Sequence, residues 1–337
     1  MLLTVGGYHC SAYSPVEPVK LRVQENTPFG SRRIAAIVPC HNEELTVGKV
    51  ISDLRAALPG ADIYVYANNC SDNTAEVARE AGAIVRFENR PGKGNVIRRA
   101  FADVDADIYL IIDGDDTYEA ADAPGMVQTM IDGNYDHVLG VRTPTDSTAY
   151  RPGHERGNRA FNVLTSWTFR DRVTDMLSGF RVFSRRFVRS FPAVSRHFEI
   201  ETELTVHTMS LRLPNTEYPV GFRDRPEGSF SKLSTFKDGF RILWLITQLT
   251  AHERPRLFYG GLTALFALIS LLLGIPVVWE FFQTGYVPRL PTALLSAGCM
   301  ILAFLMGSVG IIMDGVRRAR RETSRLHYLA LPAPGNE

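Results

Sequence analysis

The sequence lacks an excess of charge of either sign. Its 337 residues include 37 basic and 36 acidic side chains, which gives a formal net charge of +1 at pH 7. Binding to nucleic acid depends on a basic surface field, and the near balance of charges provides none over the whole chain. We therefore expect no nucleic-acid partner, and any anionic ligand must be bound by a local cluster of basic residues.

Cysteine is scarce, and its spacing excludes two common kinds of stabilisation. The four cysteines are far apart in the sequence and match neither a disulfide framework nor zinc spacing, at Cys10, Cys40, Cys70 and Cys299. We interpret them as reduced thiols of a cytosolic compartment. The eight histidines show no metal-ligand spacing either. The residues before position 34 lack the apolar core of a signal peptide, so nothing there predicts export of the globular part.

Long apolar runs are absent from most of the chain and occur twice near its C-terminal end. Residues 259–279 and 291–313 contain no charged side chain, and the linker between them holds only Glu280 and Arg289. Each run has the length of about 20 apolar residues that a membrane-spanning helix requires. A buried hairpin of a soluble protein is the alternative.

Basic residues flank this pair of runs on both outer sides. They are Lys232, Lys237, Arg241, Arg254 and Arg256 before the first run and Arg317, Arg318, Arg320, Arg321 and Arg325 after the second. By the positive-inside rule both flanks are cytoplasmic. The sequence thus predicts an integral membrane protein with two spans, whose N-terminal domain and C-terminus face the cytoplasm of a bacterial inner membrane or an equivalent one.

From residue 34 onward, short β-rich runs alternate with helical ones. The strand-like runs are 34–38, 63–67, 84–87, 108–112 and 136–141, and a further one follows at 216–220. This alternation predicts an α/β domain with a mainly parallel sheet. Ligands of such sheets gather at the carboxyl ends of the strands. Polar clusters follow the strands there, at residues 39–44, 68–72, 89–94 and 113–116, which indicates one functional site.

The cluster Asp113-Gly114-Asp115 directly follows an apolar strand. Its two carboxylates can reach one divalent cation, and oxygen ligands of this kind suit Mg²⁺ or Mn²⁺ with a diphosphate. A solvated acidic turn is the alternative, and the position after a buried strand favours the metal. Gly92-Lys93-Gly94 could offer backbone N–H groups and an ammonium to a phosphate, although it matches neither the P-loop nor the dinucleotide fingerprint.

These motifs resemble those of family 2 glycosyltransferases of the GT-A fold, and specifically the polyprenyl-phosphate glycosyltransferases, such as dolichyl-phosphate mannose synthase and bacterial undecaprenyl-phosphate sugar transferases. The resemblance covers residues 34–235 and extends to the two-helix tail. The motifs that carry it are Val38-Pro39-Cys40-His41-Asn42-Glu43-Glu44, Cys70-Ser71-Asp72-Asn73-Thr74, Gly92-Lys93-Gly94, Asp113-Gly114-Asp115, Gly140-Val141-Arg142, Ser178-Gly179-Phe180-Arg181 and Gly228-Ser229-Phe230-Ser231-Lys232.

The family resemblance implies a role for particular residues. Asp113 and Asp115 would hold the metal, and Arg142 with Arg156 would hold the phosphate of the acceptor. The nucleotide-sugar site would comprise Pro39, His41, Glu43, Asn69, Asp72, Lys93, Asp113, Gly114, Asp115, Arg225 and Lys232.

Three positions depart from the family pattern. His41 replaces a usual tyrosine, Asn68-Asn69-Cys70 replaces an Asp-Asp-Gly run, and Thr117 stands where a metal-side glutamine is often found. The first two leave the nucleobase open, so that both UDP- and GDP-linked donors are compatible with the sequence.

The implied reaction is the inverting transfer of a sugar to a polyprenyl phosphate at the cytosolic membrane face. A lipid monophosphate is mostly dianionic at neutral pH and needs no strong base. The candidate catalytic residues are Asp113, Asp115, Arg142 and Glu201. Glu201, between Glu199 and Glu203 on a predicted helix at 199–211, is either a base or part of a solvated face.

Two rival functions stay open. A transferase for another membrane-proximal acceptor, such as a lipid-linked saccharide or a glycerolipid, would need a base, which would favour Glu201. A membrane-anchored nucleotide-sugar-binding scaffold without turnover is the other. The intact pair of Asp113 and Asp115 argues against the scaffold.

The expected organisation of the chain has five parts, and a homo-oligomer is compatible with it. The membrane is itself an expected partner, because residues 236–249 place apolar side chains at near-helical spacing just before the first span, as in an interfacial helix. The parts are an N-terminal extension at 1–33, a GT-A catalytic domain at 34–235, a juxtamembrane interfacial helix at 236–256, a transmembrane hairpin at 257–316 and a basic cytoplasmic tail at 317–337.

Overall fold

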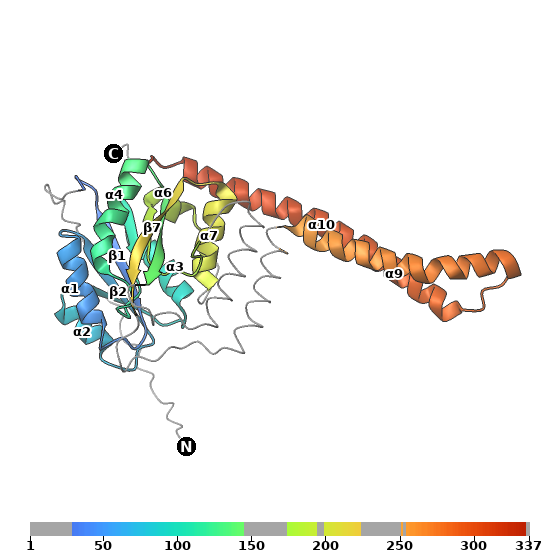
Figure 1. Ribbon diagram of the computed structural model, residues 1–337, viewed down its shortest axis with the longest axis horizontal. Helices are drawn as coiled ribbons and strands as arrows, with labels where there is room; N and C mark the ends of the chain where they lie inside the picture. The colour runs from blue at the N-terminus through green and yellow to red at the C-terminus, as the bar shows by residue number, and fades with distance from the viewer. Residues whose placement is uncertain (1–28, 145–173, 194–198, 224–250, 252–253, 335–337) are drawn as a thin grey trace, which may run out of the picture.

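The computed structural model describes residues 29–144, 174–193, 199–223, 251 and 254–334. In these residues a sheet covered by helices on both faces forms a globular domain, and a long helical hairpin projects from it (Figure 1). The predicted N-terminal extension and interfacial helix lie almost entirely outside the described residues.

One seven-stranded sheet, in the order β3-β2-β1-β4-β6-β5-β7, organises the domain. All strands are parallel except β6, which runs antiparallel to both of its neighbours. The strands are β1 (Ile34–Cys40), β2 (Asp62–Asn68), β3 (Ile84–Glu88), β4 (Ile108–Ile111), β5 (His137–Pro144), β6 (Arg181–Ser184) and β7 (Asn215–Phe222). The predicted mainly parallel α/β sheet is confirmed, and β6 is a strand that the sequence pattern did not predict.

The strand order reverses between β1 and β4. The chain builds outward from β1 to β3 and then returns to place β4 on the other side of β1. In open α/β sheets such a reversal opens a crevice at the carboxyl ends of the two strands. The polar clusters that follow β1 and β4 lie at this point of the fold.

Helices cover each face of the sheet. Among the described residues, the α-helices of the domain are α1 (Val47–Ala57), α2 (Thr74–Glu80), α3 (Lys93–Asp103), α4 (Ala123–Gly133), α6 (Arg185–Ser190) and α7 (Glu199–Leu211), and η1 (Ala120–Asp122) is a short 3₁₀ helix. Side chains of α1, α2 and α4 join the core on one face, and those of α3, α6 and α7 join the core on the other. Successive residues of β1 contribute alternately to the two cores, as the period of a strand requires.

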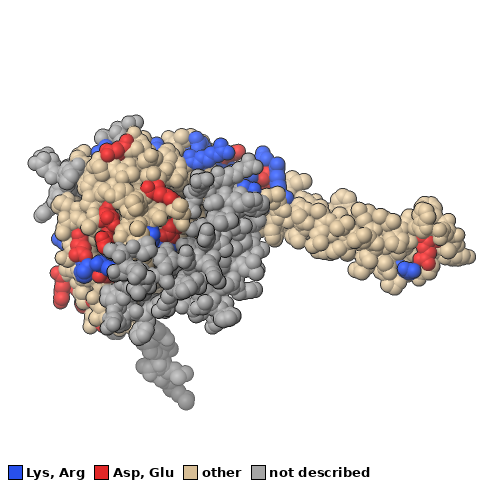
Figure 2. All heavy atoms as spheres, in the orientation of Figure 1, with Lys and Arg blue, Asp and Glu red and all other residues tan. Residues whose placement is uncertain are grey.

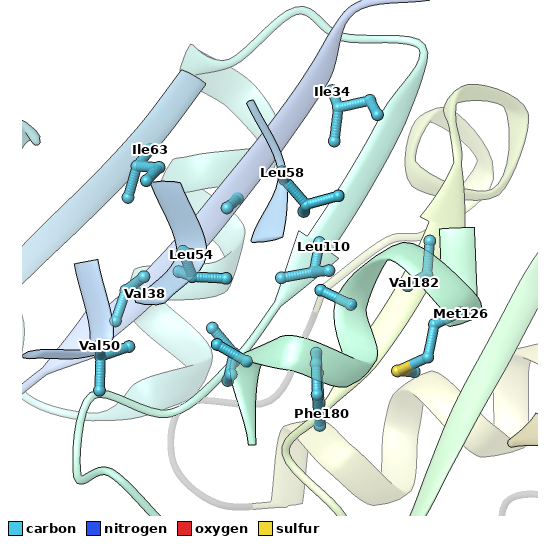
Figure 3. Close-up of a cluster of buried hydrophobic side chains, with 14 of the residues drawn as sticks. Ile34, Val38, Val50, Leu54, Leu58, Ile63, Leu110, Met126, Phe180 and Val182 are labelled. Carbon is cyan, nitrogen blue, oxygen red and sulfur yellow. The ribbon is translucent and has the colours of Figure 1, made fainter. Parts of the chain in front are cut away.

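Helix α1 illustrates how these helices dock. Its buried residues Val47, Val50, Ile51 and Leu54 follow the spacing of one helix face. Figure 3 shows Val50 and Leu54 beside Val38 in the core. Leu54 is fully buried, so that Leu54→Ala would cost about 2–5 kcal/mol through lost burial and the cavity left behind.

The hairpin consists of α9 (Pro255–Thr284) and α10 (Leu290–Leu329), both long and apolar enough to cross a membrane. Its large apolar side chains point outward, and Phe282 and Ile311 are 79% and 76% exposed. Small residues lie between the helices, where Ser270 Oγ donates to Ser296 O and Ser296 Oγ to Ser270 O, each at 2.8 Å. Close packing on small and hydroxyl side chains is typical of helix pairs in membranes.

Charged groups mark both ends of the apolar part of the hairpin (Figure 2). Arg289 lies 3.4 Å from Glu280 at the turn. At the other end the buried Asp314 accepts from Arg317 and lies 2.8 Å from Arg256. Helix α10 continues beyond this group to Leu329, so that the predicted basic tail begins inside a helix.

Candidate active site

The loops that follow β1, β2, β3 and β4 are hydrogen-bonded to one another at the carboxyl edge of the sheet. Thr46 Oγ1 donates to Gly114 O at 2.7 Å, which joins the first loop to the fourth. His41 Nδ1 lies 2.7 Å from Asn68 O, which joins the first to the second. Asn68 Oδ1 accepts from the Gly92 N–H at 2.8 Å, which joins the second to the third. The structure therefore brings the predicted polar clusters together.

The residues expected to contact the nucleoside lie along one side of this edge. His41 and Asn69 are exposed, and Pro39 and Glu43 are half-buried. Asn69 has a φ of 52°, a left-handed conformation that asparagine tolerates better than most residues. The Asp72 carboxylate accepts hydrogen bonds from the backbone of the first loop and from the start of α2, so it organises this edge.

Lys93, at the start of α3, brings Asp113 and Glu201 together. Its Nζ lies 2.5 Å from Asp113 Oδ1 and 2.7 Å from Glu201 Oε1. The side chains of Lys93 and Glu201 are only 9% and 8% exposed, whereas that of Asp113 is 28% exposed. Burial alone lowers the pKa of Lys93, but the charges of Asp113 and Glu201 outweigh burial and raise it above its usual value. Lys93 is thus a permanent cation between two acids.

Glu201 does not belong to a solvated helix face. It lies in the first turn of α7 and points its carboxylate at Lys93. Burial raises the pKa of Glu201, and the charge of Lys93 opposes that rise. Of the two alternatives that the sequence left open, the structure removes the solvated face.

The second carboxylate of the acidic cluster is more enclosed than the first. Asp115 is 6% exposed, and its Oδ1 accepts from the Thr117 hydroxyl at 2.7 Å. Gly114 between the two aspartates packs so closely on β1 that a Cβ there would collide with Cys40 Sγ. The glycine therefore allows the acidic turn to lie against the first strand.

Arg142, near the end of β5, forms a two-pronged ion pair. Its Nε and Nη2 donate to the two oxygens of Asp175, each at 2.6 Å. Asp175 is almost fully buried, and the Arg142 guanidinium lies 5.2 Å from the centre of the Phe222 ring. An arginine held in this way has a fixed orientation.

Sequence reasoning did not identify Arg181 and Tyr118, which hold the loops of the site in place. Arg181, the first residue of β6, is completely buried and donates to Ser178 O at 2.8 Å and Met176 O at 2.6 Å. Burial lowers the pKa of Arg181 to about 10. Tyr118 accepts the Gly179 N–H at 2.8 Å, and a Cβ at Gly179 would collide with Asp113. The sequence signal that could have indicated this region is the motif Ser178-Gly179-Phe180-Arg181, which is part of the family resemblance.

The donor set at the acidic cluster fits a divalent cation that also binds a diphosphate. Among the described residues no group of three or more His, Cys, Asp or Glu side chains could hold a metal alone. Asp113 and Asp115 carry carboxylate oxygens of the kind that Mg²⁺ accepts, and Mg²⁺ usually takes its remaining ligands from water and substrate phosphates. Lys93 is a competing partner of Asp113, since it holds one oxygen of that carboxylate.

Three residues predicted for the site lie outside the described residues. They are Arg156, Arg225 and Lys232. Their assignments stay predictions.

Comparison with known proteins identifies several relatives. The sequence model of Glycosyl transferase family 2 matches residues 35–191. An uncharacterized protein of Shigella flexneri is 47% identical over 155 residues, which are 46% of this chain and 95% of that protein. Glycosyltransferase AglJ of Haloferax volcanii is 30% identical over 295 residues, 86% of this chain and 95% of its own length. A dolichyl-phosphate hexose transferase of the same organism is 27% identical over 224 residues, 66% of this chain and 96% of its own length.

A solved structure shares the fold. Glucosyl-3-phosphoglycerate synthase of Mycobacterium tuberculosis, in complex with Mn²⁺, UDP and glucosyl-3-phosphoglycerate, superposes with a TM-score of 0.54 at 23% identity, over 65% of this chain and 79% of that one. The predicted GT-A architecture of the domain is confirmed by this likeness. The domain thus combines the GT-A fold with the network of ion pairs described above.

Proposed function

The chain belongs to glycosyl transferase family 2 and is a glycosyltransferase, and from this premise we propose that it transfers a sugar from a nucleotide-sugar donor to a polyprenyl phosphate at a membrane surface. The observation that carries the proposal is α10, which runs without a break from a candidate membrane span to contacts with the catalytic domain. An acceptor buried in the bilayer by its lipid tail is the substrate that such an attachment serves. The likeness to a dolichyl-phosphate hexose transferase supports the same acceptor class.

The donor would bind across the carboxyl edge of β1 and β4. We assign its nucleoside to the side lined by Pro39, His41, Glu43 and Asn69, and its diphosphate to the acidic cluster. Asp113 and Asp115 would hold a divalent cation, which supplies positive charge to the departing nucleoside diphosphate. Both UDP- and GDP-linked sugars fit this description.

The acceptor would bind beside Arg142. Asp175 fixes the guanidinium in one orientation, so that a phosphate meets a preformed cation without an added cost of ordering the side chain. A dianionic phosphate oxygen attacks the anomeric carbon directly and needs no proton removed. Positioning of two anions is then the main task of the chain's own residues.

Glu201 has a different role in this reaction. Its Oε1 accepts from Lys93, and with Asp113 it encloses the ammonium between two segments that are far apart in the sequence. We propose that Glu201 orients Lys93 and the acidic turn and does not remove a proton from the acceptor.

The proposed orientation puts the domain and the C-terminus on the cytoplasmic side. The basic residues that flank the two spans support the cytoplasmic side. Contacts of Arg325, Tyr328 and Pro334 with the domain require the end of α10 and the domain to share one side of the membrane. Reporters fused before Ile34 and after Glu337 should both read as cytoplasmic. A lumenal or periplasmic C-terminus would contradict the two-span arrangement.

The function itself is tested by labelling. Membranes that contain the chain are incubated with a panel of radiolabelled UDP- and GDP-sugars, and lipid extracts are assayed for acid-labile label. We expect one donor to label a lipid that releases its sugar in mild acid, because sugar phosphates of lipids are acid-labile. Label that appears only in an acid-stable lipid would identify a hydroxyl acceptor and overturn the proposal.

A further inference from the structure

The last turn of α10 is built into the catalytic domain. Tyr328 is 7% exposed and belongs to the core that α3, α6 and α7 form on one face of the sheet. Its hydroxyl donates to Asp136 Oδ2 at 2.8 Å. The guanidinium of Arg186 covers the Tyr328 ring, 4.6 Å from its centre. A helix end that merely passed the domain would not bury a tyrosine in this way.

Asp136 is a buried hydrogen-bond acceptor for the Tyr328 hydroxyl. It is completely buried, and it accepts from Ser184 Oγ at 2.6 Å and from Arg186 Nη2 at 2.7 Å. A buried carboxylate requires several donors, and the tyrosine hydroxyl is one of them. The buried carboxylate of Asp136 therefore takes one of its hydrogen bonds from Tyr328, a residue of the membrane helix.

A second contact grips α7. Arg325 Nη1 donates to Leu211 O at 3.3 Å, at the C-terminal end of that helix. A cation at a helix C-terminus binds carbonyls that have no partner within the helix and meets the negative end of its dipole. Beyond α10, Arg32 Nε donates to Pro334 O at 3.1 Å. We call the contacts of Arg325 and Tyr328 the clamp.

The clamp holds the two elements that carry Glu201 and Arg142. Leu211 is the last residue of α7, and Glu201 lies about 15 Å away along the same helix at the usual rise. Asp136 directly precedes β5, and Arg142 lies about 20 Å further along that strand. The clamp residues therefore do not touch the reactants, and they act on the site through these elements.

From these contacts we propose that the clamp makes α10 a rigid strut, which fixes the height and tilt of the active site above the membrane, with Arg325 and Tyr328 as positioning residues. The helix has 40 residues and no internal proline or break after its first turn, so it spans about 60 Å as one rod. One end of this rod packs against α9 and the other is fastened to the domain. The inference rests on the proposed acceptor, since only a substrate held in the bilayer makes orientation matter for the reaction.

The test compares a clamp variant with a matched variant of the same turns. Arg325→Ala/Tyr328→Ala removes both contacts, and Leu326→Ala/Leu329→Ala changes two side chains that are 70% and 62% exposed. Tyr328→Phe, which keeps the ring and removes only the hydroxyl, covers the case in which the double variant fails to fold. All proteins are reconstituted at full length in vesicles that contain long-chain polyprenyl phosphate, and they are also assayed with a short-chain, water-soluble prenyl phosphate.

We expect the clamp variant to lose about tenfold or more in transfer to the embedded acceptor, in line with the cost of misplaced substrates. Transfer to the soluble acceptor should stay within about twofold, because that acceptor can reach a tilted site by diffusion. The exposed-face variant should match the wild type on both. Equal losses of transfer to both acceptors would show that the clamp only supports folding. No loss with either acceptor would show that the clamp does not affect transfer. Each result would overturn the inference.

A readout without any acceptor separates this inference from the proposed function. Trypsin should cleave the clamp variant after Arg317, Arg318, Arg320 or Arg321, which all the compared proteins share, about fivefold faster than the wild type or the exposed-face variant, since release of the helix end favours local opening. If wild-type protein labels neither acceptor, the proposed function fails. Unchanged cleavage in the clamp variant would instead contradict the strut.

Discussion

Two groups of paired acidic and basic side chains, called clusters below, lie at opposite edges of the same sheet. Asp113 and Glu201 surround Lys93 just beyond β4, at the carboxyl edge. Asp136 lies just before β5, at the amino edge, since β4 and β5 both run antiparallel to β6. Both clusters pair a largely buried basic side chain with acids, yet they differ in how the charge is balanced.

At the amino edge the balance is complete within the protein. Asp136 faces one cation, Arg186, and its other donors are the neutral hydroxyls of Ser184 and Tyr328. At the carboxyl edge, Lys93 contacts two acids, and Asp115 lies in the same turn as Asp113. An excess of carboxylates invites an additional cation, whereas a neutral cluster needs none. One cluster is therefore arranged for ligands and the other for fastening chain segments together.

The strongest test of this contrast is Asp115→Asn. We expect it to abolish transfer, with a loss of about 1,000-fold or more, because one carboxylate fewer weakens the cation that neutralises the leaving group. The fold should persist, since the amide oxygen can still accept from Thr117. Activity is measured as lipid-product formation with saturating Mg²⁺ or Mn²⁺, and Asp132→Asn, at an exposed aspartate on α4, is the matched control. Near-normal transfer by Asp115→Asn would remove the metal assignment.

The corresponding change at the amino edge should act on stability instead. Asp136→Asn leaves the buried end of Arg186 without its counter-charge, and breaking such a pair costs about 3–5 kcal/mol. Asp105→Asn alters a more exposed ion-paired aspartate, 43% exposed, and should cost less than about 1 kcal/mol. Denaturant unfolding of the detergent-solubilised chain measures both. Equal stability of the two variants would mean that the fastening role is wrong.

Arg142→Ala addresses the acceptor side of the carboxyl edge. We expect a loss of about 30- to 1,000-fold in transfer, equivalent to about 2–4 kcal/mol, because a charge-assisted contact with the phosphate disappears. Donor binding, measured by calorimetry, should stay close to that of the wild type. Arg142→Lys should recover only part of the activity, since an ammonium lacks the planar fork.

Asp175→Asn distinguishes two roles of Arg142, binding of the acceptor phosphate and a purely structural ion pair with Asp175. The amide keeps an oxygen for the guanidinium, so we expect a smaller loss of transfer than in Arg142→Ala. If the two variants lose the same activity, the pair is structural and the acceptor phosphate binds elsewhere.

The sheet and the meeting of its loops could be predicted from the sequence because both follow from local patterns. The alternation of apolar strands and amphipathic helices fixes a parallel sheet, and a parallel sheet places polar residues after β1 and β4 at one edge. β6 was not predicted because it has only four residues, of which the first, Arg181, ends the Ser178-Gly179-Phe180-Arg181 motif, and because a helix follows it directly. A strand this short has too few residues to show a period.

The partners within the site could not be predicted. Lys93 and Glu201 are separated by 108 positions, and nothing local distinguishes a glutamate that faces a buried lysine from one that faces water. The same holds for Arg142 and Asp175, and for Tyr328 and Asp136. Such pairs depend on tertiary packing, which brings complementary charges together regardless of their distance in the chain.

Acid should lower the free energy of unfolding of the domain through two buried histidines, His137 and His207. Burial lowers the pKa of His207 to about 4, and burial also holds the pKa of His137 well below its usual value. Below about pH 6.5 the unfolded chain therefore binds protons that the folded chain does not, so the free energy of unfolding falls as pH falls. His207 alone accounts for about 2 kcal/mol of loss between pH 7 and pH 5.

The measurement is denaturant unfolding at the two pH values. His207→Gln should show a shallower fall than the wild type, because one of the two titrating groups is removed. Equal falls in the two proteins would mean that His207 is not kept neutral by the fold.

The smallest expected effect returns to the carboxyl edge, with Glu201→Gln. The glutamine oxygen can still accept from Lys93, so the acidic turn should keep its position, and the change removes one negative charge from a region that has several. Because a dianionic phosphate needs no proton removed, we expect transfer to fall by less than about tenfold, whereas loss of a true general base costs about 100- to 10,000-fold. Glu199→Gln, on the same helix turn, is the matched control, and lipid-product formation is compared with donor hydrolysis in the same samples. A well-folded Glu201→Gln variant that has lost its transfer activity would make the glutamate a base and the acceptor a hydroxyl. The excess of acids at this edge would then serve proton removal as well as metal binding. The carboxyl-edge cluster would differ from the amino-edge cluster by its catalytic base and not by ligand binding alone.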